Sequence, residues 1–192
     1  MVCMKVLAIP GSFRRGSYNR ALALNAKDLA PEGIEVEIFD LDGIPPFNQD
    51  LEEPPPEGVI ALKEKVRSAD ALLFCTPEYN YSVPGVLKNA IDWASRPFEE
   101  SPFEEKPVAI AGASTGSMGT SRAQYHLRQI CVGLGMHALV YPELLIPNAE
   151  KKFDEHGRIV DERLKEKLTE LLESLRELTA KLKCRNAQDG GG

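Results

Sequence analysis

Short apolar runs alternate along the chain with longer segments in which apolar residues recur every three or four positions. A buried strand produces the first pattern and an amphipathic helix produces the second. Five such units follow one another with short connections, which favours an α/β domain with a parallel, doubly wound sheet. The predicted strands cover residues 5–9, 34–39, 71–76, 108–111 and 138–141.

The last predicted helix begins near Asp161, whose side chain suits the position that caps a helix. Leucines from Leu164 to Leu182 then recur at three- and four-residue steps, which is typical of a helix that covers a sheet. Residues 184–192 are polar and rich in glycine, so we expect a disordered tail there. Residues 1–183 are expected to form a single domain.

In a doubly wound sheet, ligands bind beyond the carboxyl ends of the strands. The loop after the first predicted strand, residues 11–20, reads GSFRRGSYNR. Its glycines let the backbone approach an anion, and amides at a helix N-terminus point their donors toward it. The serines and arginines can add hydrogen bonds and positive charge. This composition favours a phosphate site over a plain capping loop.

Two common phosphate motifs are absent from this loop. Gly11 and Gly16 have the spacing of a P-loop, but Ser17 and Tyr18 stand where that motif requires a lysine followed by serine or threonine. The dinucleotide fingerprint is also absent, because Phe13 occupies the position of its second glycine. Nucleotide hydrolysis and Rossmann-type binding are therefore disfavoured.

The loop after the third predicted strand crowds two tyrosines and an asparagine, residues 79–81, between Pro77 and Pro84. Prolines restrict the backbone, so a rigid loop of this kind can hold a flat ligand. Aromatic side chains can also pack against a conjugated ring. A stray aromatic cluster on a surface loop is the less favoured interpretation.

The stretches GSFRRGSYNRALA, PEYNYSVPGVLKNAIDWASR and SRAQYHLRQI resemble the NADPH-dependent FMN reductase family, and most closely its bacterial quinone and chromate reductases. The resemblance covers roughly residues 4–147. It implies a flavodoxin-like three-layer sandwich, with a five-stranded parallel sheet in the order 2-1-3-4-5. It also implies bound FMN that takes a hydride from NADPH or NADH and passes two electrons to a quinone, free flavin or another small acceptor, with ping-pong kinetics. A homodimer or homotetramer is implied as well.

By the same resemblance, three groups of residues surround the FMN. The first holds the phosphate and ribityl chain, the second lines the isoalloxazine, and the third lies near the ring. The cofactor carries the chemistry, so neither a catalytic residue nor a metal ligand is expected, and Glu78 is expected to fix its loop by hydrogen bonding. The groups are Ser12, Arg14, Ser17, Tyr18 and Asn19; Pro77, Glu78, Tyr79, Asn80 and Tyr81; and Ser114, Thr115 and Gly116.

Composition narrows the choice of partners and compartment. A net charge of −6 disfavours nucleic acid, whose phosphates favour a basic surface. No apolar run approaches the roughly 20 residues that cross a bilayer, so no membrane partner is expected. Four cysteines, scattered without metal-type spacing, favour reduced thiols in a cytoplasmic protein.

Two alternative functions remain open at this point. A flavodoxin-like electron carrier would bind FMN without oxidising NAD(P)H, although the two arginines of the first loop count against it. A scaffold protein that had kept the fold would no longer take up the flavin. Trp93, Phe98 and Phe103 could be buried by a partner subunit or could equally cover their own core.

Overall fold

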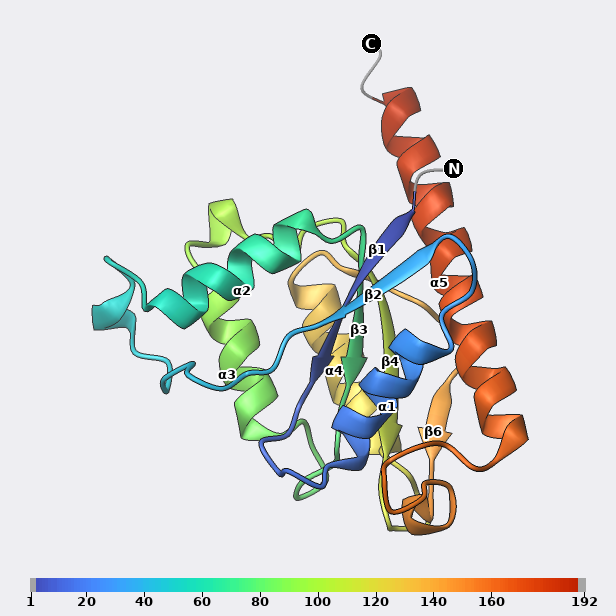
Figure 1. The fold of residues 1–192 in the computed structure, drawn as a ribbon. Helices are drawn as coiled ribbons and strands as arrows, with labels where there is room; N and C mark the ends of the chain where they lie inside the picture. The colour runs from blue at the N-terminus through green and yellow to red at the C-terminus, as the bar shows by residue number, and fades with distance from the viewer. Residues whose placement is uncertain (1–2, 190–192) are drawn as a thin grey trace.

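The structure is a computed structural model that describes residues 3–189. Its strands are β1 (Met4–Pro10), β2 (Ile34–Ile38), β3 (Ala71–Cys75), β4 (Pro107–Ala113), β5 (His137–Ala138) and β6 (Leu144–Ile146). They form one parallel sheet in the order β2-β1-β3-β4-β5, and β6 also pairs with β4 (Figure 1). The predicted flavodoxin-like sandwich and its strand order are thereby confirmed, with a sixth strand added.

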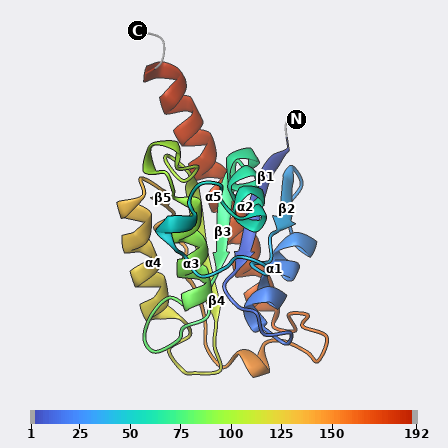
Figure 2. The ribbon, with the colours of Figure 1, turned by 90° about the vertical axis from the view of Figure 1, so that its left-hand side faces the viewer.

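Helices cover both faces of the sheet. One layer contains α1 (Tyr18–Asp28) and α5 (Glu162–Asp189), and the other contains α2 (Glu57–Ser68), α3 (Gly85–Ala94) and α4 (Ser121–Gly133) (Figure 2). Three short 3-10 helices lie in the connections: η1 (Gln49–Leu51), η2 (Phe98–Glu100) and η3 (Ala149–Lys151).

Alternation along the central strands divides the core into two clusters. In β3, Leu73 and Cys75 pack toward α1 and α5, whereas Leu72 and Phe74 pack toward the other helices. All four side chains are completely buried, which explains why the central strands show unbroken apolar runs in the sequence. The edge strand β2 instead alternates buried and exposed positions, as a half-covered strand does.

Two of the three aromatic residues that the sequence left open are buried in the core of this chain. Trp93 and Phe103 are buried, and the indole N–H of Trp93 donates to the Pro45 carbonyl at 2.8 Å. Phe98 is exposed. Of the two interpretations that the sequence left open, burial in the chain's own core holds for Trp93 and Phe103.

The prediction of a strand at residues 138–141 is wrong for residues 139–141: only Ala138 lies in a strand, at the end of β5, and the next strand, β6, begins at Leu144. Strand β5 pairs with the beginning of β4, the chain then leaves the sheet, and β6 returns to pair with the end of β4. Pro142 lies in the intervening segment 139–143 and has no N–H to donate to a ladder. The Leu139 carbonyl accepts a hydrogen bond from Arg128 of α4 at 2.7 Å instead of continuing the sheet.

Helix α5 begins as predicted but extends further. Asp161 caps it, since its Oδ1 accepts the Leu164 N–H at 2.8 Å. The helix continues to Asp189, so residues 184–189 are helical and differ from the expected disordered tail, whose last three residues, 190–192, lie outside the described residues. Arg185 pairs with Glu105 at 2.8 Å near this end. No helix in the described part of the chain combines the length and apolar character needed to span a membrane.

We expect Gly112→Ala to destabilise the fold. A Cβ at Gly112 would overlap the Thr120 hydroxyl and the Thr76 carbonyl, so the substitution should lower the free energy of unfolding by about 3 kcal/mol. Gly133→Ala is the matched control, because its Cβ would meet nothing within 4 Å and alanine is the better helix former. Guanidinium unfolding measures both; equal stability of the two variants would contradict the close packing at Gly112.

Candidate functional site

The loops after β1, β3 and β4 meet at the carboxyl edge of the sheet and line a pocket of about 200 Å³. This is the edge where a doubly wound sheet binds its ligands. Every predicted site residue lines the pocket except Asn80, Tyr81 and Gly116, and Ala113 is an additional lining residue that the sequence did not predict. The lining consists of Ser12, Arg14, Ser17, Tyr18, Asn19, Pro77, Glu78, Tyr79, Ala113, Ser114 and Thr115.

The first loop presents backbone donors at the start of α1. The Ser17 hydroxyl caps this helix by accepting the N–H groups of Asn19 and Arg20 at 3.2 and 3.3 Å. Within residues 3–189, the N–H groups of Gly16 and Tyr18 donate to no other protein atom. Free amides at the positive end of a helix dipole form an anion site.

Arg14 supplies the positive charge of this loop. Its guanidinium donates to the Gly16 carbonyl at 2.7 Å and lies 5.7 Å from the centre of the Tyr18 ring. No carboxylate of the described chain pairs with Arg14, whereas Arg20 is held by both carboxylate oxygens of Asp40 at 2.9 and 2.8 Å. The charge of Arg14 is therefore available to an anionic ligand, and that of Arg20 is largely compensated.

Asn19 joins the first loop to the third. It is almost completely buried, its Nδ2 donates to the Ala113 carbonyl at 2.9 Å, and its Oδ1 accepts the Ala113 N–H at 2.8 Å. Both ends of the amide are thus bonded within the protein. Asn19 lines the pocket, and its two hydrogen bonds hold the N-terminus of α1 against the end of β4.

Glu78 anchors the second loop on α4. Its Oε2 accepts the N–H groups of Arg122 and Ala123, in the first turn of α4, at 3.0 and 3.2 Å. The Arg122 guanidinium also pairs with its Oε1. This is the loop-fixing role expected for Glu78, and the carboxylate is favoured there by the helix dipole.

The tip of the second loop is a tight turn. Asn80 and Tyr81 have φ angles of 48° and 67°, and the flanking residues Tyr79 and Ser82 exchange backbone hydrogen bonds at 3.1 and 3.0 Å. The Arg122 guanidinium stacks 3.7 Å from the centre of the Tyr81 ring. The turn therefore directs Asn80 and Tyr81 to the rim of the site, which is why they do not line the pocket.

The third loop is fixed to the segment after β6. Ser114 accepts the Gly116 N–H on its hydroxyl at 3.1 Å and the Ala149 N–H on its carbonyl at 3.0 Å. Ser114 and Thr115 reach the pocket, whereas the Gly116 carbonyl is bonded to the Asn148 N–H at 3.3 Å. All three loops are thus held by hydrogen bonds to other elements.

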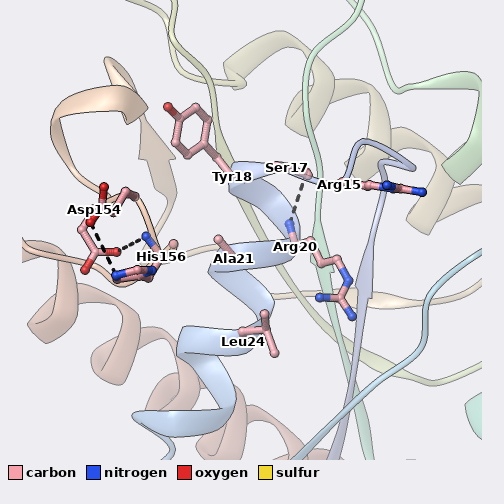
Figure 3. A pocket seen from close by; sticks show the side chains of 11 residues that line it. Arg15, Ser17, Tyr18, Arg20, Ala21, Leu24, Asp154 and His156 are labelled. Atoms are coloured by element: carbon pink, nitrogen blue, oxygen red, sulfur yellow. Dashed lines mark hydrogen bonds and ion pairs between the residues drawn. The ribbon is translucent and has the colours of Figure 1, made fainter.

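A second pocket, of about 400 Å³, lies against the outer face of α1 (Figure 3). Ser17 and Tyr18 line it as well as the first pocket, and the segment 154–157 forms one of its sides. Arg20 is already paired with Asp40, and Asp154 is occupied by the N–H groups of His156 and Arg158. The charged groups of Arg20 and Asp154 in this pocket are therefore already paired within the protein.

Sequence reasoning missed Ala113 and Arg122. The contribution of Ala113 is its backbone, which leaves no trace in residue type. Arg122 could have been found, because the buried carboxylate of Glu78 requires a partner and Arg122 lies in the first turn of the helix beside it in the fold.

Comparison with known proteins identifies the family. A family model described as NADPH-dependent FMN reductase matches residues 4–151. An NAD(P)H-dependent FMN reductase of Pseudomonas aeruginosa is 53% identical over 175 residues, covering 90% of this chain and 93% of that one. The chain belongs to the NADPH-dependent FMN reductase family. A 2-hydroxy-1,4-benzoquinone reductase of a Burkholderia species is 44% identical over 161 residues, covering 84% of this chain and 88% of its own.

Among solved structures, the flavoenzyme NAD(P)H:(acceptor) oxidoreductase FerB of Paracoccus denitrificans superposes with a TM-score of 0.85 at 32% identity, covering 93% of this chain and 98% of its own. Membership of this FMN reductase family confirms the predicted FMN-dependent NAD(P)H oxidoreductase, with FMN as cofactor and NAD(P)H as co-substrate. The electron-carrier alternative is not favoured.

The residues of the pocket fit FMN. The free amide of Tyr18, the Ser12 and Ser17 hydroxyls and the uncompensated charge of Arg14 line this pocket and match a terminal monophosphate. The free amide of Gly16 belongs to the same loop but lines the second pocket. The second and third loops then supply the half-exposed Tyr79 ring and the polar backbone that a flat heterocycle requires.

We expect Asn19→Ala to weaken the fold even without FMN. The substitution leaves the buried Ala113 N–H and carbonyl without partners, which should lower the unfolding free energy of the apoprotein by about 2 to 4 kcal/mol. Ser12→Ala is the control, since the more exposed Ser12 hydroxyl accepts only a long bond from the Arg14 N–H, at 3.3 Å. Urea unfolding of flavin-free protein decides; an unchanged midpoint for Asn19→Ala would mean that Asn19 acts only toward the ligand.

Proposed function

We propose that this FMN reductase transfers electrons from NAD(P)H to quinones at the pocket formed by the three loops. The observation that supports this proposal is the meeting of a monophosphate cradle and a rigid aromatic loop at one edge of the sheet. Residues 1–183 act as a single FMN-binding domain in this proposal. Relatives that carry quinone reductase names, such as the Burkholderia enzyme and an NAD(P)H:quinone oxidoreductase of Solanum tuberosum at 42% identity, favour quinones as acceptors.

The chain's own residues position the cofactor. Ser12, Arg14 and Ser17 hold the phosphate, and Asn19 keeps their loop fixed to β4. Residues 77–81, together with the segment 114–116, surround the ring, with Glu78 preserving the shape of the second loop. When bound, FMN would supply the two-electron chemistry that links oxidation of NAD(P)H to reduction of the acceptor.

No thiol of the core takes part in this chemistry. Complete burial raises the pKa of Cys75, and burial raises the pKa of Cys131 to about 12. Both thiols therefore stay protonated at neutral pH and act as packed apolar groups. The protein contributes position and hydrogen bonding, with the redox step left to the cofactor.

The proposal extends to the acceptor range and the cellular location. Chromate, which the resemblance implies, is included as a second acceptor beside quinones. A cytoplasmic location is supported by the four cysteines, which are all free, although two of them are exposed.

The experiment that tests the function is an anaerobic visible spectrum of the purified protein. Flavin bands that bleach within the mixing time of NADPH or NADH, and return when a quinone is added, support the proposal. Bleaching without return on addition of a quinone would remove quinones from the acceptors. Bound flavin that neither nucleotide reduces would instead revive the electron-carrier interpretation.

We expect Arg14→Ala to weaken FMN retention more than it slows reduction of the loaded enzyme. Loss of one charged hydrogen-bond donor to a phosphate should raise the dissociation constant for FMN by about 10- to 100-fold. Arg15→Ala is the control, because Arg15 lies beside the cradle without lining it. Fluorescence titration of apoprotein with FMN, followed by stopped-flow reduction at saturating FMN, separates the two effects; equal affinity in Arg14→Ala and parent would remove Arg14 from the phosphate site.

We further propose that the enzyme assembles as a homodimer or homotetramer through α4. Large apolar side chains are exposed just before this helix, on the helix itself and on the segment 139–143, which Arg128 binds to it. Tyr125 and Val132 are seven residues apart, so they share one face of α4. The exposed set is Met118, Tyr125, Val132, Val140 and Tyr141, with exposures between 57% and 80%. Such a gathering of apolar surface is typical of a subunit interface.

Val132→Asp should shift the assembly toward the monomer, because it introduces a charge into the apolar surface that a partner would bury. Val160→Asp makes the same change at an exposed valine outside α4 and the 139–143 segment and should leave the assembly intact. Light scattering after size exclusion gives the mass of each variant. A parent protein that is already monomeric, or an unchanged mass for Val132→Asp, would refute this interface.

A further inference from the structure

An apolar cavity of about 390 Å³ lies beside the FMN pocket, between the first loop, the segment 41–46 and the start of α3. No charged side chain lines it. Its walls are Phe13, Leu41, Ile44, Pro46, Gly85, Val86 and Asn89. A volume of several hundred Å³ with apolar walls is typical of small-molecule sites.

The cavity adjoins the FMN pocket through shared loops. Phe13 lies between Ser12 and Arg14, which both line the FMN pocket, and Gly85 begins α3 directly after the second loop. The first loop and α3 are in close contact, because a Cβ at Gly11 would lie 3.2 Å from side-chain atoms of Leu87. The first loop therefore borders both spaces.

The one polar side chain of the cavity is already occupied. The Asn89 Nδ2 donates to the Pro45 carbonyl at 2.8 Å, and its Oδ1 accepts the Phe47 N–H at 2.7 Å. These bonds fix the 45–47 segment against α3, so the cavity exists before any ligand binds. The lining contains no charged side chain and no polar side chain that is free to bond, and its free polar groups within the described chain include the backbone N–H groups of Gly85 and Val86. Most of the lining therefore favours an apolar group.

We propose that this cavity holds the apolar substituent of a quinone whose ring reacts at the FMN pocket. The inference rests on the proposed quinone reductase function and narrows its substrate class to quinones that carry an aliphatic chain or a second apolar ring. Phe13, which is about half exposed, then stands between the two parts of the substrate. Small hydrophilic acceptors have no apolar substituent to place in the cavity, so it does not increase their binding affinity.

Val86→Asp tests the cavity wall. The first turn of α3 contains no acidic residue, so an aspartate is compatible with the helix N-terminus while it places a charge in the cavity. With holoenzyme, KM for a decyl-substituted benzoquinone should rise by about tenfold, as expected for loss of one or two buried methylene contacts. For Val86→Asp, KM for 1,4-benzoquinone and the rate of FMN reduction by NADPH should stay unchanged. Val86→Leu, which keeps the wall apolar, should have the parent KM for the decyl quinone.

A second pair of variants keeps the test independent of any effect on α3. Phe13→Ala should raise KM for the decyl quinone in the same way, whereas Phe98→Ala, at a phenylalanine of similar exposure that does not line the cavity, should not. Equal increases for both quinones, or no increase for either, would overturn the inference.

Titration calorimetry of the oxidised holoenzyme separates this inference from the proposed function. If the parent enzyme reduces no quinone, the proposed function fails, but binding of the decyl quinone can still be compared between parent and Val86→Asp. Weaker binding to Val86→Asp supports the cavity as the site of the apolar chain. Equal binding to both, or none to the parent, overturns it.

Discussion

A pair of hydrogen bonds between the side-chain amide of Asn19 and the backbone of Ala113 joins parts of the chain that are 94 residues apart. It fixes the N-terminus of α1, where the phosphate cradle is built, to the end of β4, where the third loop begins. In a buried setting the bond is costly to break, because both backbone groups of Ala113 would lose their partners. One side chain therefore links two of the three site loops directly.

The second loop is held differently, by a helix and not by a strand. Glu78 accepts hydrogen bonds from the first amides of α4, and the Ser82 hydroxyl bonds to the His126 ring of the same helix at 2.9 Å. Arg122 of α4 also stacks on Tyr81. Helix α4 thus supports the aromatic loop and also exposes Tyr125 and Val132. An assembly through α4 would stiffen the helix on which the flavin loop rests.

The sequence was sufficient for the order of elements, since the central strands are buried on both faces and read as unbroken apolar runs. It also located the three site loops, because glycine, proline and aromatic residues gather where strands end. The end of β5 at Ala138 and the start of β6 at Leu144 were not predictable from the apolar pattern, because residues 138–141 have the composition of a short strand. Residues 184–189 continue α5, and Arg185 pairs there with the distant Glu105, a contact that local composition does not reveal. Asn19 was predicted as a ligand contact, yet its buried bonds to Ala113 became visible only once β4 was placed beside α1.

The interruption of the last strand has a consequence for how copies of this chain can meet. An uninterrupted edge strand offers a row of free N–H and carbonyl groups on which another sheet can continue. Here that row is broken at residues 139–143, and β2 at the opposite edge turns Glu35 and Glu37 outward. The edge formed by β5 and β6 therefore offers a second sheet no continuous row of backbone groups on which to add a strand.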